Sequence, residues 1–233
     1  MKILRFIPVL ALLFASATAG AEEPNRYTIN VNEFHELKVI NSVNVEYRCD
    51  PDSAGKVSFT ASPELVSLFI FSNPKGTLEI RTTDTASTVK EIPTVTVYSS
   101  YLNKVENSGD STVRVSSIAP GAEISATVIG NGRLIVHGIR ATKVNGSVKT
   151  GNGLLVLSGE CDNANFKFYG TGTIQADELK AQTVQVKASG TGSIGVWATE
   201  KLSVYGMGSS KIYYKGTPEI KKSSLGLKVE PLP

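Results

Sequence analysis

The sequence is poor in the residues from which metal centres, disulfide frameworks and nucleophilic active sites are built. Its 233 residues include two cysteines, two histidines, two methionines and one tryptophan. Two cysteines and two distant histidines supply too few ligands for a metal site, and no Gly-x-Ser-x-Gly nucleophile elbow is present. We therefore predict no catalytic residues, no cofactor site and no metal site.

The two cysteines are Cys49 and Cys161. In an exported protein they could oxidise to a disulfide. The sequence alone does not show whether their α-carbons come within bonding range. A disulfide and two independent small buried residues are both left open.

A large excess of positive or of negative charge is also lacking. Lysine and arginine number 24 against 21 aspartates and glutamates, and Lys2 and Arg5 lie in the N-terminal leader described next. Without them the balance is 22 to 21, about one net positive charge. No basic stripe predicts nucleic-acid binding, and no acidic block predicts a solvating tail.

Long hydrophobic runs are absent except near the N-terminus. A basic start at residues 1–6 precedes an apolar run at 7–14 and small residues ending in Ala-Gly-Ala at 19–21. This order is typical of a secretory signal peptide, predicted over residues 1–21. The run is too short to span a bilayer, and no cysteine near the cleavage point could carry a lipid. We expect an exported protein without a membrane span after cleavage, in the periplasm or at the cell surface.

Helical periodicity is almost missing as well. Residues 22–101 alternate apolar and polar positions, as in KVINSVNVEYR (38–48) and TVTVYS (94–99), which predicts strands with one buried face. Only SPELVSL (62–68) favours a helical turn, with Ser62 as N-cap and Pro63 in the first position. This N-terminal β region is expected to pack on the following part or to continue it; without a Gly/Ser linker, continuity is favoured.

Residues 102–233 contain an internal repeat of about twenty residues. Each unit has a small-residue turn followed by an aliphatic residue at a constant offset, as with Leu134, Leu155 and Ile174. Such a period predicts a solenoid whose units bury their core only by stacking on neighbours. We predict a parallel β-helix-like solenoid of about six coils with a C-terminal cap. The predicted turn glycines are Gly109, Gly130, Gly132, Gly151, Gly153, Gly170, Gly172, Gly190, Gly192 and Gly208.

The Gly-x-Gly pairs could instead be ligand loops, but their context argues otherwise. A dinucleotide fingerprint must open a helix, whereas each pair here leads into a β-branched or aliphatic run. The calcium-binding nonapeptide needs an aspartate where this chain has Leu134 or Ile194. The pairs are therefore interpreted as corners, with Asn131, Asn152 and the threonines after them as polar ladders.

Several segments resemble the auto-transporter adhesin head domain family, known as the GIN domain. They are FHELKVINSVNVEY, GTLEIRT, VTVYSSYLNKVENSGDSTV, the Gly-x-Gly units and GMGSSKIYYKGTPEIKKSSLG, and the resemblance covers residues 28–229. The pattern departs at residues 110–111 and 208–210, where the glycine pair is incomplete. The resemblance implies a right-handed β-helix-like fold in bacterial envelope proteins, frequent in the Bacteroidetes, with an adhesin-like role by analogy and no catalytic motif.

Three hypotheses of function follow. The first is a non-enzymatic envelope protein that binds glycans, other envelope proteins or a second copy through its solenoid surface. The second is a carbohydrate-active β-helix enzyme, disfavoured because the repeat carboxylates (Asp162, Asp177, Glu178 and Glu200) have different offsets and should lie on different edges. The third is a purely structural assembly protein.

Two weaker signals concern single residues. Trp197 could project outward to stack on a sugar, or pack at a corner. Three Asp-Ser/Thr-small motifs resemble bacterial O-glycosylation sites and single out Ser53, Thr85 and Ser111.

Overall fold

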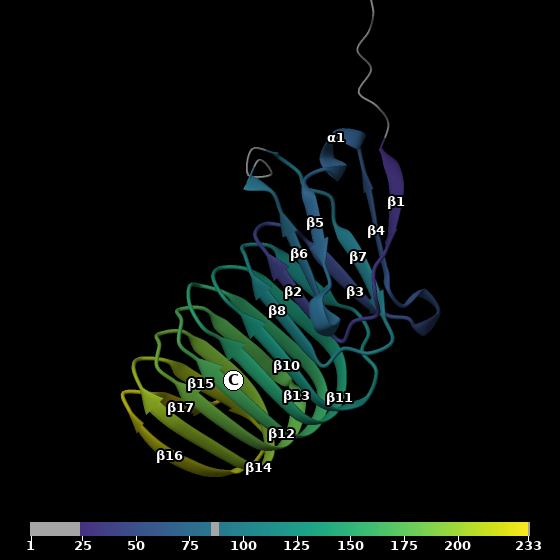
Figure 1. The fold of residues 1–233 in the computed structure, drawn as a ribbon. Helices are drawn as coiled ribbons and strands as arrows, with labels where there is room; N and C mark the ends of the chain where they lie inside the picture. Colours follow the sequence, from purple (N-terminus) through teal and green to yellow (C-terminus); the bar gives the residue numbers. More distant parts are fainter. Residues whose placement is uncertain (1–23, 85–88, 233) are drawn as a thin grey trace, which may run out of the picture.

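The computed structural model describes residues 24–84 and 89–232, and over these residues the chain is an all-β solenoid (Figure 1). Its strands join in one continuous sheet that winds through about six turns. The predicted fold class is confirmed. The signal-peptide prediction, residues 1–21, and Thr85 lie outside the described residues.

The described part of the chain holds seventeen strands and one short helix. The first nine strands are β1 (Asn25–Asn30), β2 (Glu36–Ile40), β3 (Val45–Cys49), β4 (Lys56–Ala61), β5 (Phe69–Ser72), β6 (Thr77–Thr82), β7 (Val95–Ser99), β8 (Lys104–Ser108) and β9 (Thr112–Val115). The others are β10 (Gly121–Val128), β11 (Arg133–Val148), β12 (Leu154–Phe168), β13 (Thr173–Ala188), β14 (Ser193–Met207), β15 (Lys211–Lys215), β16 (Glu219–Leu225) and β17 (Lys228–Pro231).

The coils are flattened, so the strands form two faces around a common core. One face contains β9, the first halves of β11 to β14, β15 and β17. The other contains β8, β10, the second halves of β11 to β14 and β16. Within each coil the chain crosses between the faces at two places, which we name the glycine edge, where the Gly-x-Gly turns lie, and the bent edge, where β11 to β14 bend without ending.

The core repeats in register from coil to coil, as the sequence period predicted. Leu134 pairs with Val113 on one side and Leu155 on the other, and the column continues through Ile174, Ile194 and Ile212. All six side chains are fully buried. Because one aliphatic side chain per coil stacks on the next, burial is shared between neighbours and no coil has a complete core of its own.

The N-terminal strands share the sheet with the repeats. Strands β2 and β3 pair in parallel with β8 and β9, which starts the stack. Strand β4 is antiparallel to β1 and β7, and β5 is antiparallel to β6, so the first end of the solenoid is finished by antiparallel strands. Helix α1 (Pro63–Val66) follows Ser62 as N-cap and begins with proline, as predicted.

The C-terminal end is built differently. In the segment predicted as the C-terminal cap, β16 pairs in parallel with β14, and β17 with β15. These strands extend the stack in register with the coils before them, although β16 is exposed at all but one of its residues. Leu225 and Met207, paired on this end, remain 78% and 63% exposed.

Candidate functional site

The predicted turn glycines all lie at the glycine edge, where successive coils touch through their backbones. A Cβ on Gly172 would lie 2.0 Å from the carbonyl oxygen of Gly153, and one on Gly192 equally close to that of Gly172. The N–H of Thr171 donates to the Gly151 oxygen at 2.9 Å. Since such N–H groups bond the preceding coil, they are not free to hold a phosphate.

The turn at residues 110–111, where the second glycine is missing, is completed by a buried asparagine. The Nδ2 of Asn107 donates to the carbonyl oxygens of Ser111 and Arg133 at 2.8 and 3.0 Å, and its Oδ1 accepts from the N–H of Gly109 at 3.2 Å. Asn107 is fully buried. Its side chain thus supplies the bonds that a tight glycine turn makes by backbone alone.

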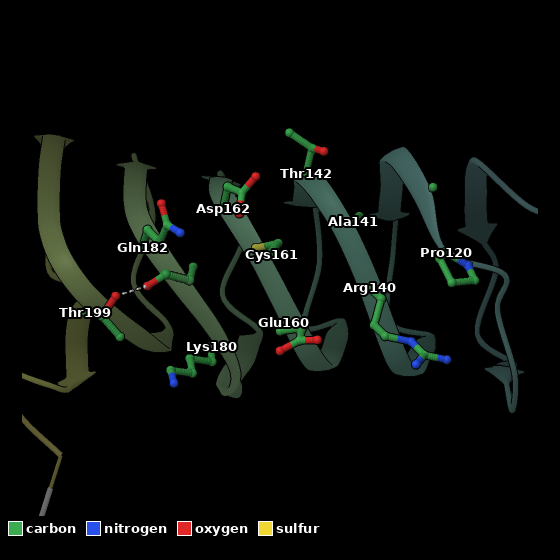
Figure 2. Close-up of a pocket in the computed structure, with 12 residues that line it drawn as sticks. Pro120, Arg140, Ala141, Thr142, Glu160, Cys161, Asp162, Lys180, Gln182 and Thr199 are labelled. Atoms are coloured by element: carbon green, nitrogen blue, oxygen red, sulfur yellow. Dashed lines mark hydrogen bonds between the residues drawn. The ribbon is translucent and has the colours of Figure 1, made fainter.

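The bent edge carries two rows of outward side chains, one member from each coil. The charged row is Arg140, Glu160, Lys180, Trp197 and Lys215, each paired in register with the next. The polar row is Thr142, Asp162, Gln182 and Thr199, which follow the paired residues Ala141, Cys161, Ala181 and Ala198. Figure 2 shows Arg140, Glu160 and Lys180 pointing to one side of the strands and Thr142, Asp162 and Gln182 to the other.

The two rows enclose a shallow trough over the bent edge. Its central part has a volume of about 500 Å³ and is lined by both rows from Arg140 to Thr199. A hollow of about 400 Å³ adjoins it and reaches Trp197, and one of about 480 Å³ continues past Pro120 and Gly121 to Tyr101. We call the whole feature the trough; it runs across the coils.

The two ends of the trough carry aromatic rings. At one end, Tyr101 is 48% exposed and stacks on His35, with ring centroids 5.8 Å apart. Beside it, Lys104 Nζ donates to Glu36 Oε2 at 2.9 Å, and this hydrogen bond lowers the pKa of Glu36 below its usual value. Sequence reasoning missed this end because Tyr101 lies in a loop outside the repeat.

At the other end, Trp197 is half-buried between two lysines. The Nζ of Lys215 lies 4.1 Å from the ring centroid and that of Lys180 lies 5.8 Å from it. The ring therefore lines the trough and also packs against side chains of the neighbouring coils.

Of the four repeat carboxylates singled out in the sequence, Asp162 is the one that lines the trough. Asp162 lines the trough together with Glu160, two residues before it on β12. Their side chains point to opposite sides of the strand (Figure 2). Among the described residues, no group of three or more His, Cys, Asp or Glu side chains could hold a metal ion.

Both cysteines are free thiols in the structure. Cys161 is buried beneath the trough, and burial raises its pKa to about 12. The Sγ of Cys49 donates to the carbonyl oxygen of Ser100 at 3.1 Å. The two thiols belong to different strands, β12 and β3.

The candidate modification sites differ in accessibility. Ser53 is partly exposed in a 3₁₀ turn, Pro51–Ser53. Ser111 is only 7% exposed and its Oγ is buried. A sugar on Ser111 would not fit the folded chain, because the next coil packs over this hydroxyl.

Residues 33–218 match the family model described as "Putative auto-transporter adhesin, head GIN domain". The chain belongs to this family. Among solved structures, a putative adhesin of Bacteroides fragilis is 23% identical with a TM-score of 0.78, and the match covers 90% of this chain and 96% of that one. A "Putative lipid binding protein" of Parabacteroides distasonis is 21% identical with a TM-score of 0.70, covering 91% and 98%.

These solved structures share the fold described above. No curated protein sequence matches the chain. Within residues 24–84 and 89–232, no helix is both long and apolar enough to cross a membrane.

Proposed function

We propose that this GIN-family chain is an exported, adhesin-like envelope protein that binds carbohydrate polymers along the trough and does not cleave them. The observation that carries the proposal is the trough itself, with its two rows of polar side chains and an aromatic ring at each end. Export is supported by the signal-peptide pattern of residues 1–21 and by the family description, which names an adhesin head.

The dimensions of the trough suit a polymer. Neighbouring strands lie about 4.8 Å apart, so the five coil steps from Tyr101 to Trp197 span about 24 Å. The trough is open along this length, whereas sites for small molecules are enclosed and mostly apolar. A linear chain could contact one hydrogen-bonding side chain at each coil.

The chemistry of the lining also suits sugars. Thr142 and Gln182 offer hydroxyl and amide groups that both donate and accept, and Asp162 offers acceptors. Aromatic rings add apolar faces with a polar surrounding. This combination matches the C–H faces and hydroxyl groups of a pyranose.

Cleavage is less well supported than binding. Glycosidases place two carboxyl groups on opposite sides of one bond, whereas Glu160 and Asp162 extend away from each other (Figure 2). The family description names no reaction either.

The test is affinity electrophoresis of the chain from residue 22 onward, in gels containing a panel of neutral and acidic polysaccharides. We expect retardation by at least one polysaccharide and no new reducing ends on prolonged incubation. Thr142→Trp, which fills the trough, should abolish retardation, while Thr191→Trp on the exposed glycine edge should not.

Other outcomes would indicate a different function for the protein. New reducing ends or unsaturated products would establish the enzyme alternative. Binding to lipid vesicles alone would extend to this chain the role named for the Parabacteroides protein. Retardation by no polysaccharide would reject carbohydrate binding and favour a structural role.

A further inference from the structure

The two ends of the trough differ in how their cations are paired. Near the Tyr101 end, Lys104 lies 2.9 Å from Glu36, and Lys143 lies 3.3 Å from Glu123. In the charged row, by contrast, no carboxylate of the described part of the chain forms an ion pair with Arg140, Lys180 or Lys215.

Glu160 is the one carboxylate of the charged row. It stands between Arg140 and Lys180 in register, one coil from each, and lies beyond ion-pair distance of both. The charged row thus carries three cations and one carboxylate, and two of the cations lie at the Trp197 ring. Within this row, cations outnumber carboxylates.

We propose that the Trp197 end of the trough is a subsite for a sugar bearing a carboxylate, so that the ligand is an acidic polysaccharide. This inference rests on the proposed function and specifies its ligand. The sugar ring would pack on Trp197, and its carboxylate would accept hydrogen bonds from Lys180 and Lys215, or from Lys180 and Arg140.

The space for such a sugar is present. The hollow of about 400 Å³ at this end is lined by Gly138 and Gly159, which have no side chains, together with Ile139, Arg140, Glu160, Lys180 and Trp197. A Cβ on Gly138 would meet no atom within 4 Å. The bulge in β11 between Val136 and Ile139 includes Gly138, which lines this hollow.

The lysine contacts with the Trp197 ring can be exchanged for contacts with a ligand carboxylate. A cation held over a partly exposed aromatic ring is bound only weakly, whereas a hydrogen bond to a charged partner is stronger. Lys215 can therefore leave the Trp197 ring to pair with an incoming carboxylate. The uncovered ring face then becomes available to the sugar.

Three polymers separate the relevant interactions. Polygalacturonate carries one carboxylate per sugar, its methyl ester is a neutral chain of the same shape, and dextran sulfate is anionic without carboxylates. Dissociation constants would be measured by titration calorimetry with oligomers of each at two salt concentrations.

We expect polygalacturonate to bind at least about tenfold more tightly than the methyl ester, with an affinity that falls as salt rises. The double variant Lys180→Ala/Lys215→Ala should lose at least about tenfold in affinity for polygalacturonate and little for the methyl ester. Trp197→Phe should bind more weakly than the parent but more tightly than Trp197→Ala.

The matched control is Lys167→Ala/Lys187→Ala. These two exposed lysines are also paired in register on neighbouring coils, but lie on the outer face of β12 and β13, away from the trough. This variant has the same loss of charge and should bind as the parent does. Thermal unfolding of each variant checks that the fold is retained.

The contradicting results are distinct. Equal affinity for polygalacturonate and its ester would overturn the inference and leave the proposed function standing. Equal or tighter binding of dextran sulfate, or loss of binding in the Lys167/Lys187 variant instead, would show nonspecific charge attraction and overturn the subsite. Binding of none of the three, nor of any polysaccharide in the electrophoresis panel, would reject both proposals.

Discussion

The glycine edge and the bent edge turn the same coils by opposite means. At the glycine edge, the chain reverses in a few residues, and neighbouring backbones approach so closely that a Cβ on Gly172 or Gly192 would overlap a carbonyl oxygen. At the bent edge, strands of 15 or 16 residues continue through the corner. There the outward side chains vary, and residues as different as Arg140, Glu160 and Trp197 occupy one row. The glycine edge holds the coils together through close backbone contacts, and the bent edge exposes varied side chains to solvent.

The largest expected effect comes from the same substitution made at both edges. Gly172→Ala should lower the free energy of unfolding by more than about 2 kcal/mol, because the new methyl group meets backbone that cannot move alone. Gly121→Ala on the bent edge has no atom within 4 Å of its Cβ and should change it by less than about 0.5 kcal/mol. Urea denaturation measures both; equal effects would mean that the edges do not differ in packing.

Asn107→Ala tests the turn of the glycine edge at residues 110–111, where the second glycine is missing and the Asn107 side chain makes the hydrogen bonds. Asn107→Ala should cost about 2–3 kcal/mol, since it leaves the buried oxygens of Ser111 and Arg133 and the N–H of Gly109 short of partners. Thr142→Ala, exposed on the bent edge, should be nearly neutral. A neutral Asn107→Ala would show that this turn relaxes without its side chain.

The fold was largely predictable from the sequence because the glycine edge repeats. The twenty-residue spacing and the aliphatic column from Val113 to Ile212 follow from turns that only glycine fits and from a core that stacks. The pairing of the C-terminal segment was harder to predict, because β16 is almost wholly exposed and has no glycine pair, yet it pairs in register with β14.

The trough was not predictable from the sequence, because bulges change the number of residues between the turn glycines and the bent edge from one coil to the next. Arg140, Glu160, Lys180 and Trp197 follow the first glycine of their units by ten, nine, ten and seven residues, yet they share one row. Register shifts after Val136, Val156 and Ala176 absorb the difference. Constant offsets from the glycines therefore do not identify this row.

The reactivity of the Cys161 thiol, which is buried beneath the trough, is a further test of the bent edge. With its pKa raised to about 12, Cys161 should be thiolate in only about one molecule in ten thousand at pH 8, and should not react with a disulfide reagent in the native state. The measurement uses Cys49→Ser, leaving one thiol, with the guanidinium-unfolded protein as the reactive reference. Rapid native labelling would mean that the bent edge opens.

The smallest effect concerns the paired cation at the Tyr101 end. Lys104→Ala should cost less than about 1 kcal/mol at neutral pH, because the ion pair is partly exposed. The folded-state pKa of Glu36 is lowered, so the pair stabilises the fold above the ordinary glutamate pKa of about 4.3 and loses this effect as pH falls through the folded value.

The variant and the parent should therefore converge in unfolding free energy once the pH has fallen below the lowered pKa of Glu36. Lys180→Ala, at the unpaired end, should show no such pH-dependent difference from the parent. Equal pH dependence in the two variants would remove the distinction between the ends.

The most direct measurement of the division between the edges is an amide chemical-shift map of the ¹⁵N-labelled protein titrated with galacturonate oligomers. Carbohydrate binding along the trough predicts shifts confined to the bent edge, around residues 138–142, 158–162, 178–182 and 197–199, with the Gly-x-Gly turns unchanged. Shifts centred on the glycine edge, or spread over the outer faces without a maximum at the trough, would contradict it.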